Sequence, residues 1–400
     1  MAKLIKRQGA FGRGDRYVAL TLSGLEKYLE AELNLFGAEE LTTSAGAVGF
    51  RAGPATLYAA LLRSRLSVRI LRNLASFDAD TREELYQKVT RLSWEEILAP
   101  GKTFAIRPQT FSSQFKNARF ASQVVKDAIV DRQRKRLGKR SSVDADRPDL
   151  QLQLRITDRS VELSLDVTSD PLSKRGYRKV GGTAPINEVL AAGLLDIAGW
   201  SGDRPLLDPF CGSGTILAEA VIKALNVPPA ISRRAWCHTS WPDFDSRLWE
   251  QTRRAARANA LPRRRGGDPV TGKKAGDVRL FGMDSDSAQI EAARSNLQRL
   301  GAEELVSLAV GDALEANPIG EGVTVVSNLP YGERIDLEQE ELESLYRGFG
   351  DRLKKSVSGG DAWLLTGNKK ASKAFGLRSS SRTILYNGPI ECRLIHFELY

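Results

Sequence analysis

The chain has 400 residues, enough for two or three domains, and its hydrophobic share of 42% is ordinary for a globular protein. No apolar run reaches the length of a membrane span and the charged N-terminus lacks a signal-peptide core, so we expect a cytoplasmic protein with no membrane partner. Three scattered cysteines argue against disulfides and against a bound metal, and the net charge of +10 favours an anionic partner.

Short helices and strands are predicted in the first part of the chain. Leu25, Leu29 and Leu33 recur every fourth residue, which predicts a helix that ends near Phe36. Apolar runs then predict a strand, a helix and a second strand at residues 47–50, 55–66 and 70–77. Such a mixture of short elements is typical of small α+β units.

A helix predicted at residues 120–136 carries the first of three basic clusters. Its basic residues, on the helix and just beyond it, are Lys126, Arg132, Arg134, Lys135, Arg136, Lys139 and Arg140. The other clusters are residues 263–265 with Lys273 and Lys274, and Lys369, Lys370, Lys373, Arg378 and Arg382. Each alone is compatible with a solvated face, but three together favour binding to a phosphate backbone.

From residue 184 onward, predicted strands and helices alternate, which indicates a doubly wound parallel sheet. Two of its strands end in Asp208 and Asp284, which lie further apart than one strand–helix–strand unit requires. We therefore expect an insertion at residues 226–276. Its tryptophans are expected to form a local core rather than a base-stacking set, and they are Trp236, Trp241 and Trp249.

A loop of small residues follows the strand that ends in Asp208, and a helix begins near Ile216. Gly212 and Gly214 in this loop allow the backbone to approach a bound molecule closely. Ligands of such sheets bind at the carboxyl ends of the strands. This loop therefore predicts a ligand site.

Two further acids end predicted strands at the same edge. Asp284 is placed to accept hydrogen bonds from ribose hydroxyls, and Asp312, which precedes Ala313, from an adenine amine. The alternative for each is a helix N-cap. We assign that capping role to Asp286.

The segment Asn328-Leu329-Pro330-Tyr331 follows an apolar strand predicted at residues 323–327. The Asn328 side chain and the Leu329 carbonyl offer two acceptors for the two N–H groups of an aromatic amine. Tyr331 offers a flat face for stacking a base. The alternative is a turn that caps the strand.

The string at residues 208–215, Asp-Pro-Phe-Cys-Gly-Ser-Gly-Thr, resembles the cofactor loop of class I S-adenosylmethionine-dependent methyltransferases that modify exocyclic amines. With Asn-Leu-Pro-Tyr and further short matches, the chain is similar to bacterial THUMP-domain RNA methyltransferases of the large-subunit ribosomal RNA guanine-N2 type. Those further matches lie at residues 24–26, 84–86, 126–131, 174–178 and 184–188. The similarity runs from about Tyr17 to Tyr400.

The resemblance implies an α/β fold in which a Rossmann-like class I methyltransferase domain follows α+β ferredoxin-like and THUMP domains. The implied parts are a ferredoxin-like part, a THUMP domain, a linker and the methyltransferase domain, at residues 1–70, 71–169, 170–183 and 184–400. It also implies S-adenosylmethionine as cofactor and structured RNA as partner, either 23S ribosomal RNA or a large-subunit precursor.

The resemblance assigns three groups of site residues. The catalytic positions are Asn328, Leu329, Pro330 and Tyr331. The cofactor positions are Asn187, Asp208, Phe210, Gly212, Gly214, Thr215, Asp284, Asp312 and Ala313. The RNA-binding positions are the seven basic residues around the helix at 120–136 together with Lys174, Arg175, Tyr177 and Arg178.

Leu329 replaces the first proline of the Asn-Pro-Pro-Tyr that the family usually has, although the backbone carbonyl is retained. Asn-Leu-Pro-Tyr is also similar to ribosomal RNA adenine-N6 methyltransferases. Guanine-N2 methylation of transfer RNA, DNA amino-methylation and a non-catalytic role in RNA-binding ribosome assembly are also compatible with these motifs. Some family members carry a second methyltransferase domain, but this sequence predicts one activity only.

Overall fold

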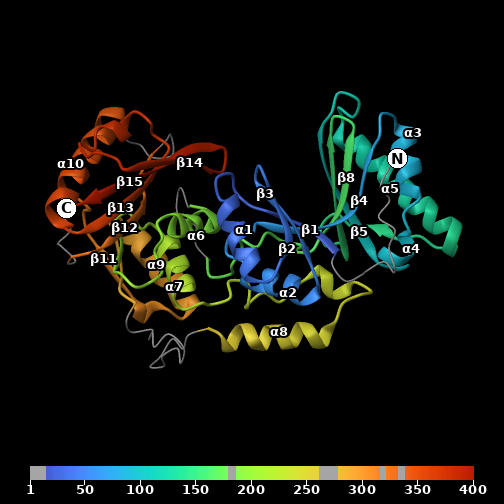
Figure 1. Ribbon diagram of the computed structural model, residues 1–400, viewed down its shortest axis with the longest axis horizontal. Helices are drawn as coiled ribbons and strands as arrows, with labels where there is room; N and C mark the ends of the chain where they lie inside the picture. The colour runs from blue at the N-terminus through green and yellow to red at the C-terminus, as the bar shows by residue number, and fades with distance from the viewer. Residues whose placement is uncertain (1–14, 179–185, 261–277, 316–320, 332–337) are drawn as a thin grey trace.

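The computed structural model describes residues 15–178, 186–260, 278–315, 321–331 and 338–400. Three parts lie in a row along the long axis: the C-terminal sheet at one end, the first α+β unit in the middle and the second at the other end (Figure 1). Within the described ranges, no helix is both long and apolar enough to cross a bilayer.

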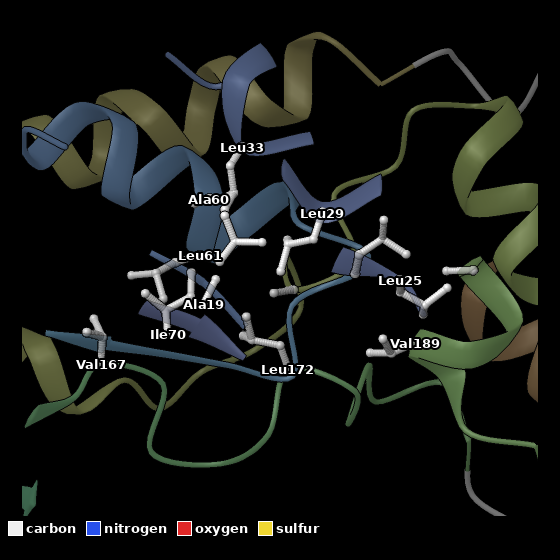
Figure 2. Packing of buried hydrophobic residues seen from close by; sticks show 14 of the residues in the cluster. Ala19, Leu25, Leu29, Leu33, Ala60, Leu61, Ile70, Val167, Leu172 and Val189 are labelled. Atoms are coloured by element: carbon white, nitrogen blue, oxygen red, sulfur yellow. The ribbon is translucent and has the colours of Figure 1, made fainter. Parts of the chain in front are cut away.

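The first unit comprises β1 (Asp15–Leu20), α1 (Glu26–Leu35), β2 (Glu39–Ser44), β3 (Ala47–Ala52), α2 (Pro54–Arg63) and β4 (Arg69–Asp78). The two predicted helices and the two predicted strands are present as α1, α2, β3 and β4, whereas β1 and β2 were not predicted. Leu25, Leu29 and Leu33 are fully buried, as their spacing predicts. Figure 2 shows these leucines gathered with Ala19, Ala60, Leu61 and Ile70.

The second unit comprises α3 (Arg82–Thr90), α4 (Trp94–Ile97), β5 (Thr103–Phe111), α5 (Ala118–Leu137), β6 (Ser142–Val143), β7 (Leu150–Thr157) and β8 (Ser160–Asp166). Strand β4 joins the two units in one sheet of order β2-β3-β1-β4-β8-β7-β5-β6. Its first residues pair with β1, and residues 71–78 pair with β8. The domain boundary predicted at residue 70 therefore falls inside a continuous strand.

The C-terminal sheet has the order β11-β10-β9-β12-β13-β15-β14. Its strands are β9 (Leu206–Asp208), β10 (Leu280–Asp284), β11 (Val306–Val310), β12 (Thr324–Asn328), β13 (Gly360–Thr366), β14 (Ser381–Asn387) and β15 (Ile390–Leu399). Its helices are α6 (Glu188–Ile197), α7 (Thr215–Ala224), α9 (Ser287–Leu300) and α10 (Gln339–Ser356). The first five strands are parallel, but β15 is antiparallel to both neighbours, so the predicted parallel sheet is a mixed one.

The insertion after α7 contains a short 3-10 helix η1 (Cys237–Ser240) and α8 (Ser246–Ala258), and it returns to the first unit, where α8 lies along α2 (Figure 1). Its three tryptophans are buried, which confirms the predicted local core. Trp236 and Trp249 pack around His238, and Trp249 also packs against Tyr58 of α2. The basic cluster at residues 263–265, Lys273 and Lys274 lies outside the described residues.

Ion pairs between partly or fully buried side chains also fix the first unit to the catalytic domain. Arg65, which follows α2, donates to Asp196 of α6 at 2.8 Å, and Lys223 of α7 reaches the same carboxylate at 2.5 Å. Arg72 of β4 bridges Asp15 and the insertion's Asp243. Because removing one partner leaves a buried charge uncompensated, such pairs hold the domains in one arrangement.

Candidate active site

Three of the predicted site residues lie at one edge of the C-terminal sheet, because parallel strands bring their carboxyl ends together. The central strand β9 ends at Asp208, with β10 on one side and β12 on the other. The neighbouring strands end at Asp284 and Asn328. The sheet thus assembles residues that are far apart in the chain.

The glycine loop after β9 is tied to β10 and α9. Gly212 and Gly214 both have positive φ, at 50° and 77°, so a side chain at either position would be strained. The Gly212 N–H donates to the Asp284 carboxylate at 2.9 Å, and a Cβ on Gly214 would lie 3.0 Å from the Cβ of Ala293. The second Asp284 oxygen accepts from the Asp286 N–H at 3.0 Å. Asp284 therefore shapes the loop.

Asp208 joins this loop to the strand that carries Asn328. Its Oδ1 accepts from the Ser327 hydroxyl at 2.6 Å and from the Phe210 N–H at 3.3 Å. The pKa of Asp208 is raised to about 7, chiefly by burial and to a smaller extent by the nearby charge of Asp284, while these two hydrogen bonds act in the opposite direction. A carboxyl group inside the protein thus connects both halves of the site.

The side-chain carbonyl Oδ1 of Asn328 is buried and has no hydrogen-bond partner among the described residues. A buried acceptor left unpaired costs about 1–3 kcal/mol, so it requires an explanation. The Pro330 carbonyl, in contrast, accepts from the Tyr346 hydroxyl at 2.8 Å, and the Leu329 N–H donates to the Leu365 carbonyl at 3.0 Å. The motif is rigidly held, and it presents one acceptor that lacks its donor.

Tyr331 is held from two directions and is only 8% exposed. Its hydroxyl accepts from Asn387 Nδ2 at 2.9 Å, and the Cys392 thiol lies 3.4 Å away. A Cβ on Gly367 would lie 2.6 Å from the tyrosine Cδ2, so the ring rests directly against this glycine. Burial raises the pKa of Tyr331. The ring is therefore less open than the expected stacking platform, because Gly367 occupies one side of it.

Other predicted cofactor residues have protein partners. Asn187 caps α6 by accepting from the Val189 N–H at 2.8 Å, and Asp286 caps α9, as predicted. Asp312 accepts from the Leu314 N–H at 2.9 Å. Thr215 accepts from Arg178 Nη2 through its hydroxyl at 2.7 Å. Phe210 packs against Phe349 in an edge-on arrangement, and Ala313 is buried in the same hydrophobic core.

The predicted RNA-binding residues fall into two groups. On and after α5, the exposed ones are Arg134, Lys135, Arg136, Lys139 and Arg140. Lys126 pairs with its neighbour Asp127, Arg132 pairs with Glu95 at 2.8 Å, and Arg134 lies 3.6 Å from Asp131, so these three have acidic partners within the protein.

The segment at residues 174–178 corrects the prediction. Arg175 is buried and pairs with Glu219 of α7 at 3.3 Å, and Tyr177 donates to the same carboxylate at 3.1 Å. Arg178 is partly buried and pairs with Glu188. Only Lys174 is well exposed. These charges serve the contact between the linker and the catalytic domain, so Arg175 and Tyr177 are unavailable to RNA.

The sheet is mixed, a glycine loop follows its central strand β9, an acid ends the neighbouring strand β10, and Asn-Leu-Pro-Tyr lies at the end of β12. These features define a class I S-adenosylmethionine-dependent methyltransferase. Family models match in three consecutive stretches: the RlmL ferredoxin-like domain at residues 16–71, the THUMP domain at 79–166 and the RMKL-like methyltransferase domain at 175–396. The chain belongs to the RlmL-like family of THUMP-containing RNA methyltransferases.

Relatives cover the whole architecture. The chain is 37% identical to slr0064 of Synechocystis sp., a protein named as an RNA methyltransferase, over 96% of this chain and 97% of that one. It is 36% identical to the ribosomal RNA large subunit methyltransferase K/L of Syntrophotalea carbinolica, of which it spans 53%. The crystal structure of SMU.472 complexed with SAH is similar with a TM-score of 0.86 and 27% identity, over 98% of this chain and 99% of that one.

Proposed function

We propose that the protein transfers the methyl group of S-adenosylmethionine to the exocyclic N2 amine of a guanine in 23S ribosomal RNA. The observation that carries the proposal is the buried Oδ1 of Asn328 at the carboxyl end of β12, which has no partner within the part of the chain that the structure describes. An exocyclic amine supplies the missing N–H donor. With the Leu329 carbonyl as second acceptor, both amine hydrogens are held and the nitrogen lone pair is turned away from the ring.

The chemistry is a direct displacement. The cofactor supplies a methyl carbon bound to a sulfonium, and the amine nitrogen forms a bond to that carbon while the carbon–sulfur bond breaks toward sulfur. The methylated nitrogen then releases one proton to water. The chain's own contribution is to orient the amine through Asn328 and Leu329 and to exclude bulk water around them.

Neither histidine serves as a general base in this proposal. His238 lies among the aromatic rings of the insertion, and His396 stacks on Trp363 at 3.9 Å and contacts Asp361 at 2.8 Å. Asp208 ends the strand beside β12, but its carboxyl group already accepts from the Ser327 hydroxyl. A proton released to water requires no further residue.

The cofactor is proposed to lie along the glycine loop. Gly212 and Gly214 leave room for its close approach, and Asp284 and Asp312 remain the proposed acceptors for ribose and adenine. Asn187, whose oxygen caps α6, contributes through its amide nitrogen in this arrangement.

Ribosomal RNA is the proposed substrate because the K/L relatives are named for it and because α5 ends in exposed basic residues on the THUMP side of the molecule. A target base inside a helix is out of reach, so the guanine must be unpaired or flipped out. Such a substrate places the activity in the cytoplasm.

The test is transfer of labelled methyl from S-adenosylmethionine to purified 23S ribosomal RNA, transfer RNA and DNA. Digestion of the product to nucleosides distinguishes N2-methylguanosine from N6-methyladenosine. Asn328→Ala is expected to lower the rate by about a hundredfold or more, because an acceptor toward a developing charge is lost. Label on adenine, on DNA alone or on no substrate would contradict the proposal in different ways.

A further inference from the structure

The outward side of β14 exposes apolar side chains next to cations. Arg382, Ile384 and Tyr386 alternate along the strand and share one side of the sheet, while Leu385 between them is fully buried on the other. Ile384 is 52% exposed and Tyr386 is 38% exposed. We call these three residues the β14 face. Exposed aromatic and aliphatic groups gathered on one strand indicate a binding surface.

The β14 face lies on the side of the sheet opposite Tyr331, close to the edge that carries the proposed catalytic residues. The turn after β14 carries Asn387, whose side chain donates to the Tyr331 hydroxyl at 2.9 Å. Tyr386 precedes Asn387 directly but points to the other side of the sheet, so its exposed ring is separated from this contact by the sheet edge. Because β15 is antiparallel to β13, this turn lies at the same edge of the sheet as Asn328.

Cations flank the β14 face. Arg393 lies opposite Ile384 in the register of β14 and β15, and its Nε is buried without a hydrogen-bond partner among the described residues. Lys369 pairs at 2.5 Å with Glu391, the residue opposite Tyr386. Lys370 is also exposed. The β14 face thus places an aromatic ring beside the guanidinium groups of Arg382 and Arg393, while Glu391 compensates the charge of Lys369.

The edge of β14 is partly covered by the protein itself. A Cβ on Gly24 of the first unit would lie 2.9 Å from the Ile384 carbonyl and 2.8 Å from Leu385. This close approach blocks an added strand at that point. The outward side chains, rather than the strand edge, are what the surface offers to a partner.

We propose that the β14 face binds the unpaired nucleotides that flank the target base. Stacking of a base on an aromatic ring with cations along the backbone is how single-stranded nucleic acid is bound. This inference rests on the proposed function, since it names where the same RNA substrate continues beyond Tyr331. It assigns to β14 and β15 a role in RNA recognition that is separate from the basic residues of α5.

The test compares Tyr386→Ala and Tyr386→Phe in the full chain, with Tyr400→Ala as a matched control at an exposed tyrosine beyond the far end of β15. The probes are a fluorescein-labelled RNA hairpin with a long guanine-containing loop and a fully paired RNA of the same stem. Tyr386→Ala is expected to weaken binding of the hairpin by roughly 5- to 150-fold, the effect of removing one stacked aromatic. Binding of the paired RNA and of S-adenosylmethionine stays unchanged, and Tyr386→Phe keeps most of the affinity.

A second measurement uses 4-thiouridine in the loop and maps the crosslinked peptide by mass spectrometry, with a crosslink within residues 381–393 as the expected result. In steady-state assays Tyr386→Ala raises KM for RNA and leaves KM for S-adenosylmethionine unchanged. Two results overturn this inference: wild-type affinity for the hairpin in Tyr386→Ala, or an effect of the substitution that is confined to self-association in sedimentation. Methyl transfer by the wild type still leaves the proposed function standing. A wild type that methylates no RNA contradicts the proposed function instead, whatever the crosslinks show.

Discussion

Replacing Asp208 by Asn is expected to stabilise the protein and to do so more at high pH. The folded protein keeps this carboxyl protonated up to a pKa of about 7, whereas the unfolded chain releases the proton near 3.8. Between these values, rising pH lowers the free energy of unfolding, and above about pH 7 this loss of stability is complete. At about 1.4 kcal/mol per pH unit, the full effect is about 4 kcal/mol.

An amide does not titrate, and its Oδ1 can still accept from Ser327 and Phe210. The free energy of unfolding of Asp208→Asn should therefore exceed that of the wild type by about 2–3 kcal/mol more at about pH 8 than at about pH 5. Urea denaturation at the two pH values measures this difference, with Asp286→Asn as the control at an exposed acid. A difference that does not change with pH would refute the argument, and a simultaneous loss of cofactor affinity would show that the charge is kept for binding.

Three further outcomes are expected. Gly367→Ala should push the Tyr331 ring from its place, because the new Cβ would lie 2.6 Å from it, with a loss of about 1–3 kcal/mol in stability and a lower kcat; unchanged kcat by steady-state assay would argue against the role of the ring. Asp284→Ala should weaken S-adenosylmethionine binding by about 1–3 kcal/mol in calorimetry, and wild-type affinity in a folded variant would remove this acid from the site. On α5, alanine replacements of Arg134, Lys135 and Arg136 should lower the log–log slope of RNA affinity against salt concentration by about two to three. An unaltered slope would mean that these residues form a solvated helix face instead.

Local sequence patterns predicted those parts of the site that lie within a single short segment of the chain. The glycine loop and the strand that ends at Asn328 each depend on residues adjacent in sequence, and each is present in the structure. The spacing of Leu25, Leu29 and Leu33 likewise predicted a buried helix face.

Contacts between distant segments could not be predicted in this way. The hydrogen bond from Asn387 to Tyr331 joins residues far apart in the sequence and depends on how β15 joins the sheet. Arg175 and Tyr177 have the residue types of an RNA contact, and nothing nearby in sequence reveals that Glu219 receives both. Charge in a short segment therefore does not distinguish a buried ion pair from a nucleic-acid contact.

The continuous strand β4 has a consequence for how this enzyme selects its target. Because β4 pairs with both N-terminal units, the THUMP part cannot swing freely against the ferredoxin-like part. The insertion and the ion pair of Arg65 with Asp196 then lock that assembly to the catalytic domain. Under the proposed function, the distance between the RNA fold bound by the THUMP part and the base held at Asn328 is therefore fixed. Moving the target base along its RNA should then abolish methylation, even where the surrounding bases are kept.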